Sequence, residues 1–248
     1  MTTYWTVVVI VIGAALLVLL AIWHRLDPGG GRRQRRWVAL GNAFSPTPGA
    51  RSWAASIGLA QLAEGIDLTS PGAGIADVVA GQLGPALAAR PSVAVIWVGA
   101  ADLLHGRPLV GFLRDLASVI GQLQRRGCAV LVVELTGAVP PGPGSGRPLA
   151  RSFSRTLAEW ESAIRDTCRV TGARLVRVEP GQGASPVLRL AGPLVSIEAA
   201  ELERVGRALA GPIGASLRGG AGSSWASGDW DEPADPVLRA RLGLPPVR

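Results

Sequence analysis

The sequence has few side chains that could act as a base at neutral pH. Its 248 residues contain no lysine, a single tyrosine and only two histidines, His24 and His105. Ester hydrolysis by a serine needs a base within hydrogen-bond reach of the hydroxyl, and that base needs a pKa near neutral. Beyond residue 36, His105 is the only histidine, so the composition argues against a serine hydrolase.

Cysteine is almost as scarce. Cys128 begins an apolar run and Cys168 lies in a helical pattern, which predicts buried free thiols in a reducing compartment. Two cysteines with no histidine nearby in the sequence make no metal site. We therefore expect neither a metal nor another cofactor.

Charged side chains are absent from Met1 to Trp23, and residues 7–22 are almost continuously apolar. This run is long enough to cross a bilayer, so residues 1–24 are predicted to form a single-pass transmembrane anchor. A cleaved signal peptide is the alternative, but no basic residue precedes the run and no small-x-small site follows it. The arginines after the span place the following domain in the cytoplasm; the exported face is the alternative.

The basic segment 25–36 is predicted to be a juxtamembrane linker. Its five arginines less Asp27 account for +4 of the net charge of +7, and the remaining +3 is too small to argue for nucleic acid. The linker is expected either to contact anionic lipid headgroups or to act only as a topology signal. The arginines assigned to the headgroups are Arg32, Arg33, Arg35 and Arg36.

Residues 37–217 alternate short apolar runs with longer amphipathic segments, a pattern typical of a parallel sheet covered on both faces. The predicted fold class is α/β: a three-layer α/β/α sandwich with a five-stranded, parallel, flavodoxin-like sheet, plus the N-terminal helix. Strands are predicted at 37–40, 66–68, 93–98, 129–134 and 174–178, and helices at 50–63, 75–88, 109–126, 149–171 and 197–217.

Residues 218–248 lack apolar periodicity and are predicted to be a flexible tail rich in glycine, serine, tryptophan and acidic residues. Trp225 and Trp230 are candidate partner-binding residues; packing back onto the domain is the alternative. A protein partner is therefore expected, although the sequence does not identify it.

Four short blocks follow the predicted strands or precede the last helix, and in this order they resemble the blocks of the SGNH (GDSL) esterase and acyltransferase family. The likeness runs from Trp37 to about Ile213. The blocks are Gly41-Asn42-Ala43-Phe44-Ser45, Ser70-Pro71-Gly72-Ala73-Gly74, Gly99-Ala100-Ala101-Asp102 and Ala191-Gly192-Pro193-Leu194-Val195-Ser196.

The resemblance implies a catalytic role for five positions, and at four of them the side chain is apolar. In the family the first block reads Gly-Asp-Ser, so Ala43 stands in place of the nucleophile, while Gly72 lends a backbone N–H to the oxyanion hole. Ala101 stands in place of the oxyanion asparagine. Ala191 and Leu194 stand in place of the orienting aspartate and the histidine base.

Ligands of such sheets bind outside the carboxyl ends of the strands. We expect a remnant pocket there with free N–H groups at Ala43 and Gly72. Asp102 and Glu134 are expected to make turn hydrogen bonds or ion pairs rather than to act chemically.

The leading functional hypothesis is a membrane-anchored, catalytically inactive interaction or scaffold module. One alternative is an acyl- or lipid-binding module that uses the remnant pocket. The other is an esterase or acyltransferase in which Ser45 or Ser70 works with His105.

Overall fold

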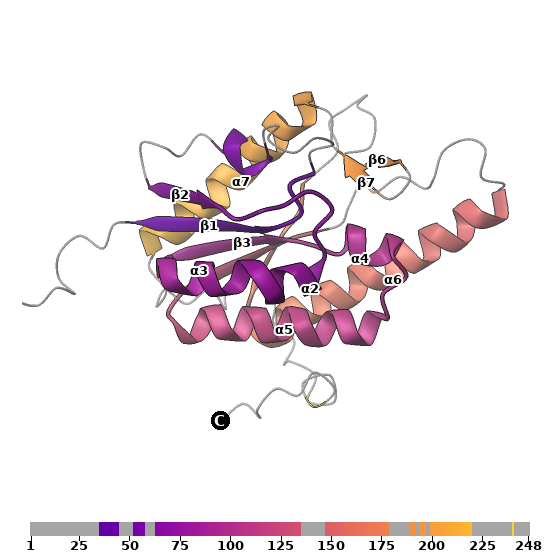
Figure 1. The fold of residues 1–248 in the computed structure, drawn as a ribbon, viewed down its shortest axis with the longest axis horizontal. Helices are drawn as coiled ribbons and strands as arrows, with labels where there is room; N and C mark the ends of the chain where they lie inside the picture. The colour runs from indigo at the N-terminus through magenta and orange to yellow at the C-terminus, as the bar shows by residue number, and fades with distance from the viewer. Residues whose placement is uncertain are drawn as a thin grey trace, which may run out of the picture. The chain divides into compact units, whose positions relative to one another are not determined.

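The computed structural model describes residues 35–44, 52–57, 63–134, 147–178, 189–191, 194–196, 199–219 and 240. Within this part of the chain, a five-stranded sheet forms the centre of the fold (Figure 1). Its strands are β1 (Arg36–Gly41), β2 (Glu64–Asp67), β3 (Val93–Trp97), β4 (Ala129–Val133) and β5 (Arg174–Val176). The order is β2-β1-β3-β4-β5 and every pairing is parallel. The prediction of a five-stranded parallel sheet is confirmed.

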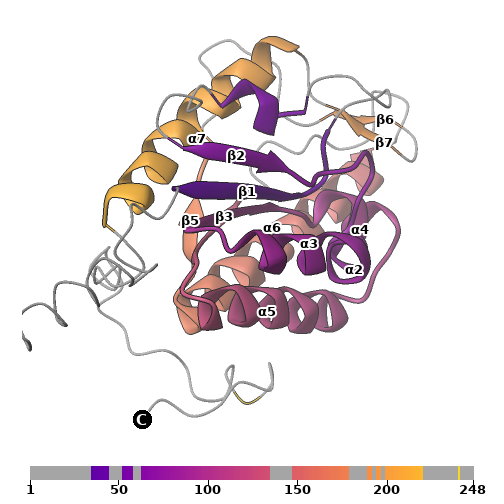
Figure 2. The ribbon, with the colours of Figure 1, turned by 60° about the vertical axis from the view of Figure 1, so that its left-hand side comes forward.

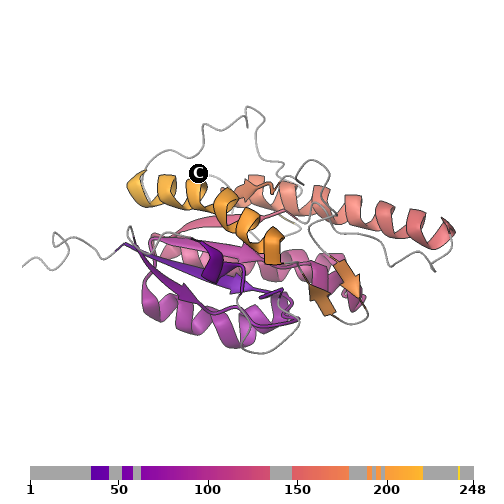
Figure 3. The ribbon, with the colours of Figure 1, turned by 90° about the horizontal axis from the view of Figure 1, so that it is seen from above.

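Helices cover both faces of this sheet. One face carries α2 (Ile75–Asp77), the π-helical segment η2 (Val78–Gln82), α3 (Leu83–Ala89), α5 (Leu109–Arg125) and α6 (Arg147–Thr171). The other carries the short 3-10 helix η1 (Ala54–Ser56) and α7 (Ala199–Gly219), which pack against each other. Figures 1 and 2 show α7 on one side of the strands and α3 and α5 on the other, and Figure 3 shows these layers from above.

The central strands are continuously apolar because both of their faces are covered. All residues of β3 are buried, and the last five residues of β1 are as well. On the helical side, the rings of Phe112 in α5 and Trp160 in α6 pack with their centroids 4.8 Å apart. Burial of each such side chain contributes roughly 1.5–3 kcal/mol, so this layer is a substantial part of the core.

The helix predicted at 50–63 is wrong in the part that the structure describes. Only Ala54–Ser56 form a 3-10 turn, and Ile57 is already extended. Tertiary contacts override the local helical pattern here. Ser52 donates to the Asp67 carboxylate, and the indole N–H of the fully buried Trp53 donates to the carbonyl oxygen of Asn42 at 2.8 Å.

A small antiparallel hairpin, β6 (Arg189–Ala191) and β7 (Leu194–Ser196), precedes α7. β7 lies against α4 (Ala100–Leu104), the short helix that follows β3 (Figure 2). In the described part of the chain, no helix combines the length and apolarity that crossing a bilayer requires. The predicted anchor, residues 1–24, lies outside the described residues.

Candidate functional site

The carboxyl end of β1 turns sharply at Gly41. Its φ of +104° belongs to a region that side chains rarely adopt, and a Cβ atom there would overlap the carbonyl oxygen of Trp97 on β3. The backbone N–H of Asn42 then donates to that same oxygen at 3.0 Å. This close approach between two strands places Asn42 and Ala43 at the end of the sheet where the first and third sequence blocks meet.

Asn42 holds two loops together. It is 1% exposed, and its Oδ1 accepts from the N–H of Phe44 at 2.8 Å and from the N–H of Gly72 at 3.1 Å. Two backbone donors on one oxygen fix the orientation of the amide, because the opposite orientation would face donor against donor. Its Nδ2, like the indole Nε1 of the buried Trp97, has no hydrogen-bond partner among the described residues.

The expected free N–H groups at Ala43 and Gly72 are not found; this prediction was wrong. The parallel ladder continues one step beyond β1 and β2 through an Asn42–Ser70 bridge, so the N–H of Ala43 donates to the carbonyl oxygen of Ser70 at 3.0 Å. Gly72, with a φ of +72°, gives its N–H to the Asn42 side chain. Both N–H groups expected to be free, including the one of Gly72 that the family resemblance assigns to the oxyanion hole, therefore have acceptors within the protein.

Gln82 is a residue of this region that the sequence interpretation missed. It lies at the end of η2, and its side-chain amide accepts from the N–H of Gly41 at 2.6 Å and donates to the Gly41 carbonyl oxygen at 3.2 Å. It also donates to Ser70 Oγ at 3.1 Å. No local pattern marks this residue, because its partners lie 12 and 41 positions away in the sequence.

Asp102 has a structural role, as expected. It is 4% exposed, and its carboxylate accepts from the N–H of Ile75 at 3.1 Å and of Gly99 at 3.2 Å, so it ties α4 to the start of α2. Burial raises the pKa of the Asp102 carboxyl, although these N–H groups and the Arg107 guanidinium, 3.8 Å away, oppose the rise. Gly74 is needed beside it, because a Cβ there would lie 2.7 Å from Asp102 Oδ1.

Glu134, at the end of β4, forms the expected ion pairs. Its buried carboxylate accepts from Arg165 Nη2 at 2.8 Å and from Arg177 Nε at 2.7 Å. The half-buried Glu161 belongs to the same cluster: burial, and then the Glu134 charge, raise the pKa of the Glu161 carboxyl. Glu134 is thus occupied in an ionic network.

Of the fallback residues of the esterase alternative, Ser70 belongs to this hydrogen-bonded network, and among the described residues no hydrogen bond joins it to His105. His105 is exposed at the end of α4, and its backbone N–H donates to the carbonyl oxygen of Ala101. Ser70 is exposed, and its hydroxyl accepts from Gln82. Ser45 lies outside the described residues.

The remaining block positions lie on elements that meet at one place. Gly99, with a φ of +106°, begins α4, and Ala101 on that helix is 2% exposed. Ala191 and Leu194 are register partners across the β6–β7 hairpin, whose second strand lies against α4. The fold therefore places the elements that carry the third and fourth blocks against each other.

The other predicted interaction residues are only partly described. Arg35 is exposed, and Arg36 begins β1 and pairs with Glu64 at 2.6 Å. Arg32, Arg33, Trp225 and Trp230 lie outside the described residues. In the described part, no group of three histidine, cysteine or acidic side chains is arranged to hold a metal ion.

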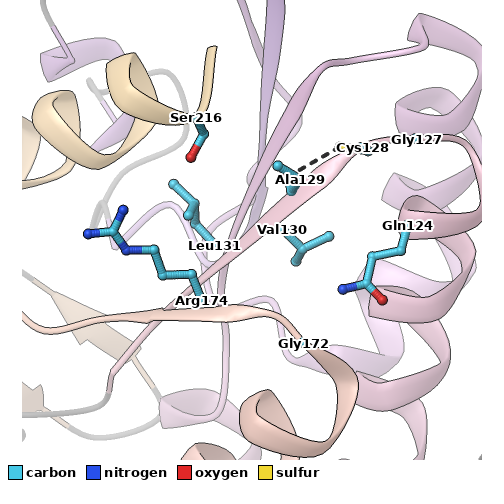
Figure 4. A pocket seen from close by; sticks show the side chains of 9 residues that line it. All are labelled: Gln124, Gly127, Cys128, Ala129, Val130, Leu131, Gly172, Arg174 and Ser216. Atoms are coloured by element: carbon cyan, nitrogen blue, oxygen red, sulfur yellow. Dashed lines mark hydrogen bonds between the residues drawn. The ribbon is translucent and has the colours of Figure 1, made fainter. Parts of the chain in front are cut away.

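A cavity of about 270 Å³ lies at the opposite, amino end of the sheet (Figure 4). It opens between the starts of β4 and β5, whereas the four blocks lie at the carboxyl ends of the strands. The residues that line it are Gln124, Gly127, Cys128, Ala129, Val130, Leu131, Gly172, Arg174 and Ser216.

The doubly wound sheet with strand order 2-1-3-4-5, and with the four blocks at its carboxyl end, has the arrangement of an SGNH-type α/β fold. The sequence profile of the GDSL-like lipase/acylhydrolase family matches residues 29–196, more than half of the chain. The chain belongs to this family.

Solved structures agree with this assignment of the fold. A lipase/acylhydrolase from Enterococcus faecalis is similar with a TM-score of 0.54 and 18% identity, over 73% of this chain and 96% of the other. The acetylxylan esterase from Geobacillus stearothermophilus is similar with a TM-score of 0.52 and 16% identity, over 77% of this chain and 95% of the other. No curated protein matches the sequence closely enough to count as a relative.

Proposed function

We propose that this GDSL-family domain is catalytically inactive and that it acts as a membrane-anchored module that binds a protein partner. The observation that carries the proposal is the environment of Ala43. A methyl group occupies the position where the family pattern calls for the attacking hydroxyl, and the N–H of Ala43 donates to Ser70. Without a nucleophile no acyl intermediate forms.

The surroundings of Ala43 support the same conclusion. An oxyanion hole needs N–H groups that point at a developing negative charge. The N–H groups of Ala43 and Gly72 instead have neutral acceptors inside the protein at 3.0 and 3.1 Å. Ala101 offers no side-chain donor, and Asp102 is engaged by Ile75 and Gly99.

The condition of the fold supports a retained role for the domain. The central strand β3 is fully buried, and the glycines Gly41 and Gly74 are present where a side chain would clash. A fold kept intact around a site without its reactive groups suits a protein that works through its surface. The candidate contact residues are Trp225 and Trp230, and the predicted N-terminal anchor would hold the module at a membrane.

The test is ester hydrolysis by the purified full-length protein, with nitrophenyl acetate and butyrate as substrates. We expect the rate to equal the rates of the His105→Ala and Ser70→Ala variants and of the heat-denatured protein, because no serine–base pair contributes. A rate above this background that falls in the His105→Ala or Ser45→Ala variant would overturn the proposal in favour of an esterase with a non-standard pair.

Partner binding is tested separately by cross-linking in cells followed by purification of the full-length protein. We expect a specific partner to be recovered with the wild type and lost in the Trp225→Ala/Trp230→Ala double variant. A Val110→Ala variant is the control, because Val110 is a large apolar side chain exposed on α5 within the folded domain. Loss of the partner in the control alone would move the contact from the tail to the domain.

The acyl-binding alternative needs an apolar space beside Ala43. The cavity described above lies at the other end of the sheet and gives this alternative no support. Mass spectrometry of lipid extracted from the purified protein tests it directly.

A further inference from the structure

Exposed arginines gather at the amino end of the sheet. Parallel strands begin at this end, and the helices that connect them end there, so the residues just before β3 and β4 and the last turn of α7 share one edge. Four of the arginines on this edge are exposed and form no ion pair with a described residue. They are Arg90, Arg125, Arg126 and Arg218.

Two further arginines begin strands at the same edge. Arg36 is the first residue of β1 and Arg174 the first residue of β5. Acidic side chains of the described part are few there: Glu64 pairs with Arg36, and Asp166, near the end of α6, pairs with Arg169 at 3.3 Å. The buried carboxylates Asp102 and Glu134 lie at the opposite end. We call the edge that carries the arginines the basic face.

Helix polarity explains only part of this arrangement. An arginine in the last turn of a helix interacts favourably with the helix dipole, which accounts for Arg125 and Arg218. It does not account for Arg174, which begins a strand. Arg90 has a φ of +49°, in the left-handed region where glycine is less strained, so an arginine is kept there at a conformational cost.

The basic face is also hollowed. The cavity of about 270 Å³ opens on it, and Figure 4 shows Arg174 and Ser216 on one side of the cavity and Gln124 on the other. Ser216 Oγ donates to the Pro212 carbonyl oxygen at 2.9 Å, and Gln124 Nε2 donates to the Thr171 carbonyl oxygen at 3.0 Å. The polar side chains that line the cavity are those of Ser216, Gln124 and Arg174. The volume is near the lower limit of small-molecule sites and suits one small polar group.

The chain outside the structure leads to this same face. Residues 1–34 precede the described part, which begins at Arg35 and enters β1 at its amino end. If residues 1–24 span the bilayer, the ten residues 25–34 reach at most about 35 Å when fully extended. The basic face is therefore the end of the domain closest along the chain to the predicted anchor.

We propose that the basic face docks on the surface of a bilayer that contains anionic phospholipids, with a lipid phosphate entering the cavity beside Arg174. Charge complementarity and the entry point of the chain favour this occupant over an acidic protein. Docking would fix the orientation of the domain, with the carboxyl end of the sheet and the β6–β7 hairpin turned away from the membrane. The proposal rests on the membrane anchor of the proposed function but does not depend on the loss of catalysis.

The test is hydrogen exchange of the full-length protein in nanodiscs of two compositions: phosphatidylcholine alone, and phosphatidylcholine mixed with phosphatidylglycerol. We expect slower exchange in residues 90–92, 126–128 and 172–174 in the anionic discs only, and loss of this protection in high salt. If the chain purifies without detergent, co-sedimentation with vesicles of the same compositions gives the equivalent measurement.

Two double variants that each remove two positive charges distinguish docking through the basic face from attraction of the whole positively charged protein to an anionic bilayer. Arg125→Gln/Arg126→Gln should lower the docking equilibrium constant about 25-fold, at about fivefold per arginine, and abolish the protection. Arg114→Gln/Arg155→Gln removes two exposed arginines from α5 and α6 away from the basic face and should leave the protection unchanged. Equal exchange in both lipid compositions, or equal effects of the two double variants, would overturn the proposal. Protection by millimolar sodium phosphate without a bilayer would also overturn it, in favour of a free anion.

Discussion

Replacing Asn42 by alanine removes the one oxygen that joins the loops after β1 and β2. The Phe44 N–H, in a fully buried residue, loses its only described acceptor, and an unsatisfied buried donor costs about 1–3 kcal/mol. The half-buried Gly72 N–H can turn to water, at about 1 kcal/mol. Alanine also removes the unpartnered Nδ2, which lowers the cost by about 1 kcal/mol. The expected net loss of unfolding free energy is about 1–3 kcal/mol.

Urea unfolding of the full-length protein, followed by tryptophan fluorescence, measures this loss through the buried Trp53 and Trp97. Asn42→Asp is the matched variant, because it keeps an acceptor oxygen. Burial raises the pKa of the Asp102 carboxyl although two backbone N–H groups donate to it. We expect burial to raise the pKa of a carboxyl at position 42 in the same way, because it would also accept from two backbone N–H groups. The variant should then approach wild-type stability in acid and fall behind as the pH rises. An alanine variant as stable as the wild type would refute the role given to Asn42.

Three more predictions concern the same fold. Gly41→Ala should destabilise by about 3 kcal/mol or more because its Cβ would overlap a backbone oxygen of β3, whereas Gly111→Ala, in open space on α5, should stabilise by about 0.5–1 kcal/mol; thermal melting compares them. Burial raises the folded pKa of Asp102 above its unfolded value of 3.8, so the carboxyl contributes stability that is present below pH 3.8 and lost as the pH rises through the folded pKa. The stability of the wild type relative to Asp102→Asn should therefore fall as the pH rises above 3.8, and a difference that does not change with pH would contradict this. Burial raises the thiol pKa of Cys128 and Cys168 to about 12, so alkylation by iodoacetamide should be slow in the native protein and fast in urea; rapid native labelling would contradict their burial.

The sheet could be predicted from the sequence because its signals are local. Continuous apolar runs such as 93–97 mark strands buried on both faces, and the apolar stripe of α5 recurs at helical spacing. The failed helix at 50–63 shows where local signals end. Its residues carry a helical pattern, but the contacts of Ser52 with Asp67 and of Trp53 with Asn42 draw the segment into a turn and an extended residue.

The sequence indicates the strand ends at which the candidate site lies, but it does not show which hydrogen bonds the backbone N–H groups form there. The blocks around Gly41 and Gly99 mark the strand ends correctly. Each glycine adopts a positive φ where its strand ends, and this requirement of the local backbone is visible in the sequence as a glycine. The acceptor of each backbone N–H depends instead on partners far away in the sequence, as with Ser70 for Ala43 and Asn42 for Gly72. Gln82 escaped notice for the same reason.

The central claim is that the site lacks more than one hydroxyl, and restoring that hydroxyl tests it most directly. Ala43→Ser supplies the missing oxygen at a position that is 5% exposed. We expect the purified full-length variant to hydrolyse nitrophenyl acetate no faster than the wild type and not to label with a fluorophosphonate, because the N–H groups of residue 43 and Gly72 already have acceptors and Leu194 stands in place of the histidine base. Ester turnover or covalent labelling that appears with this single substitution would contradict it.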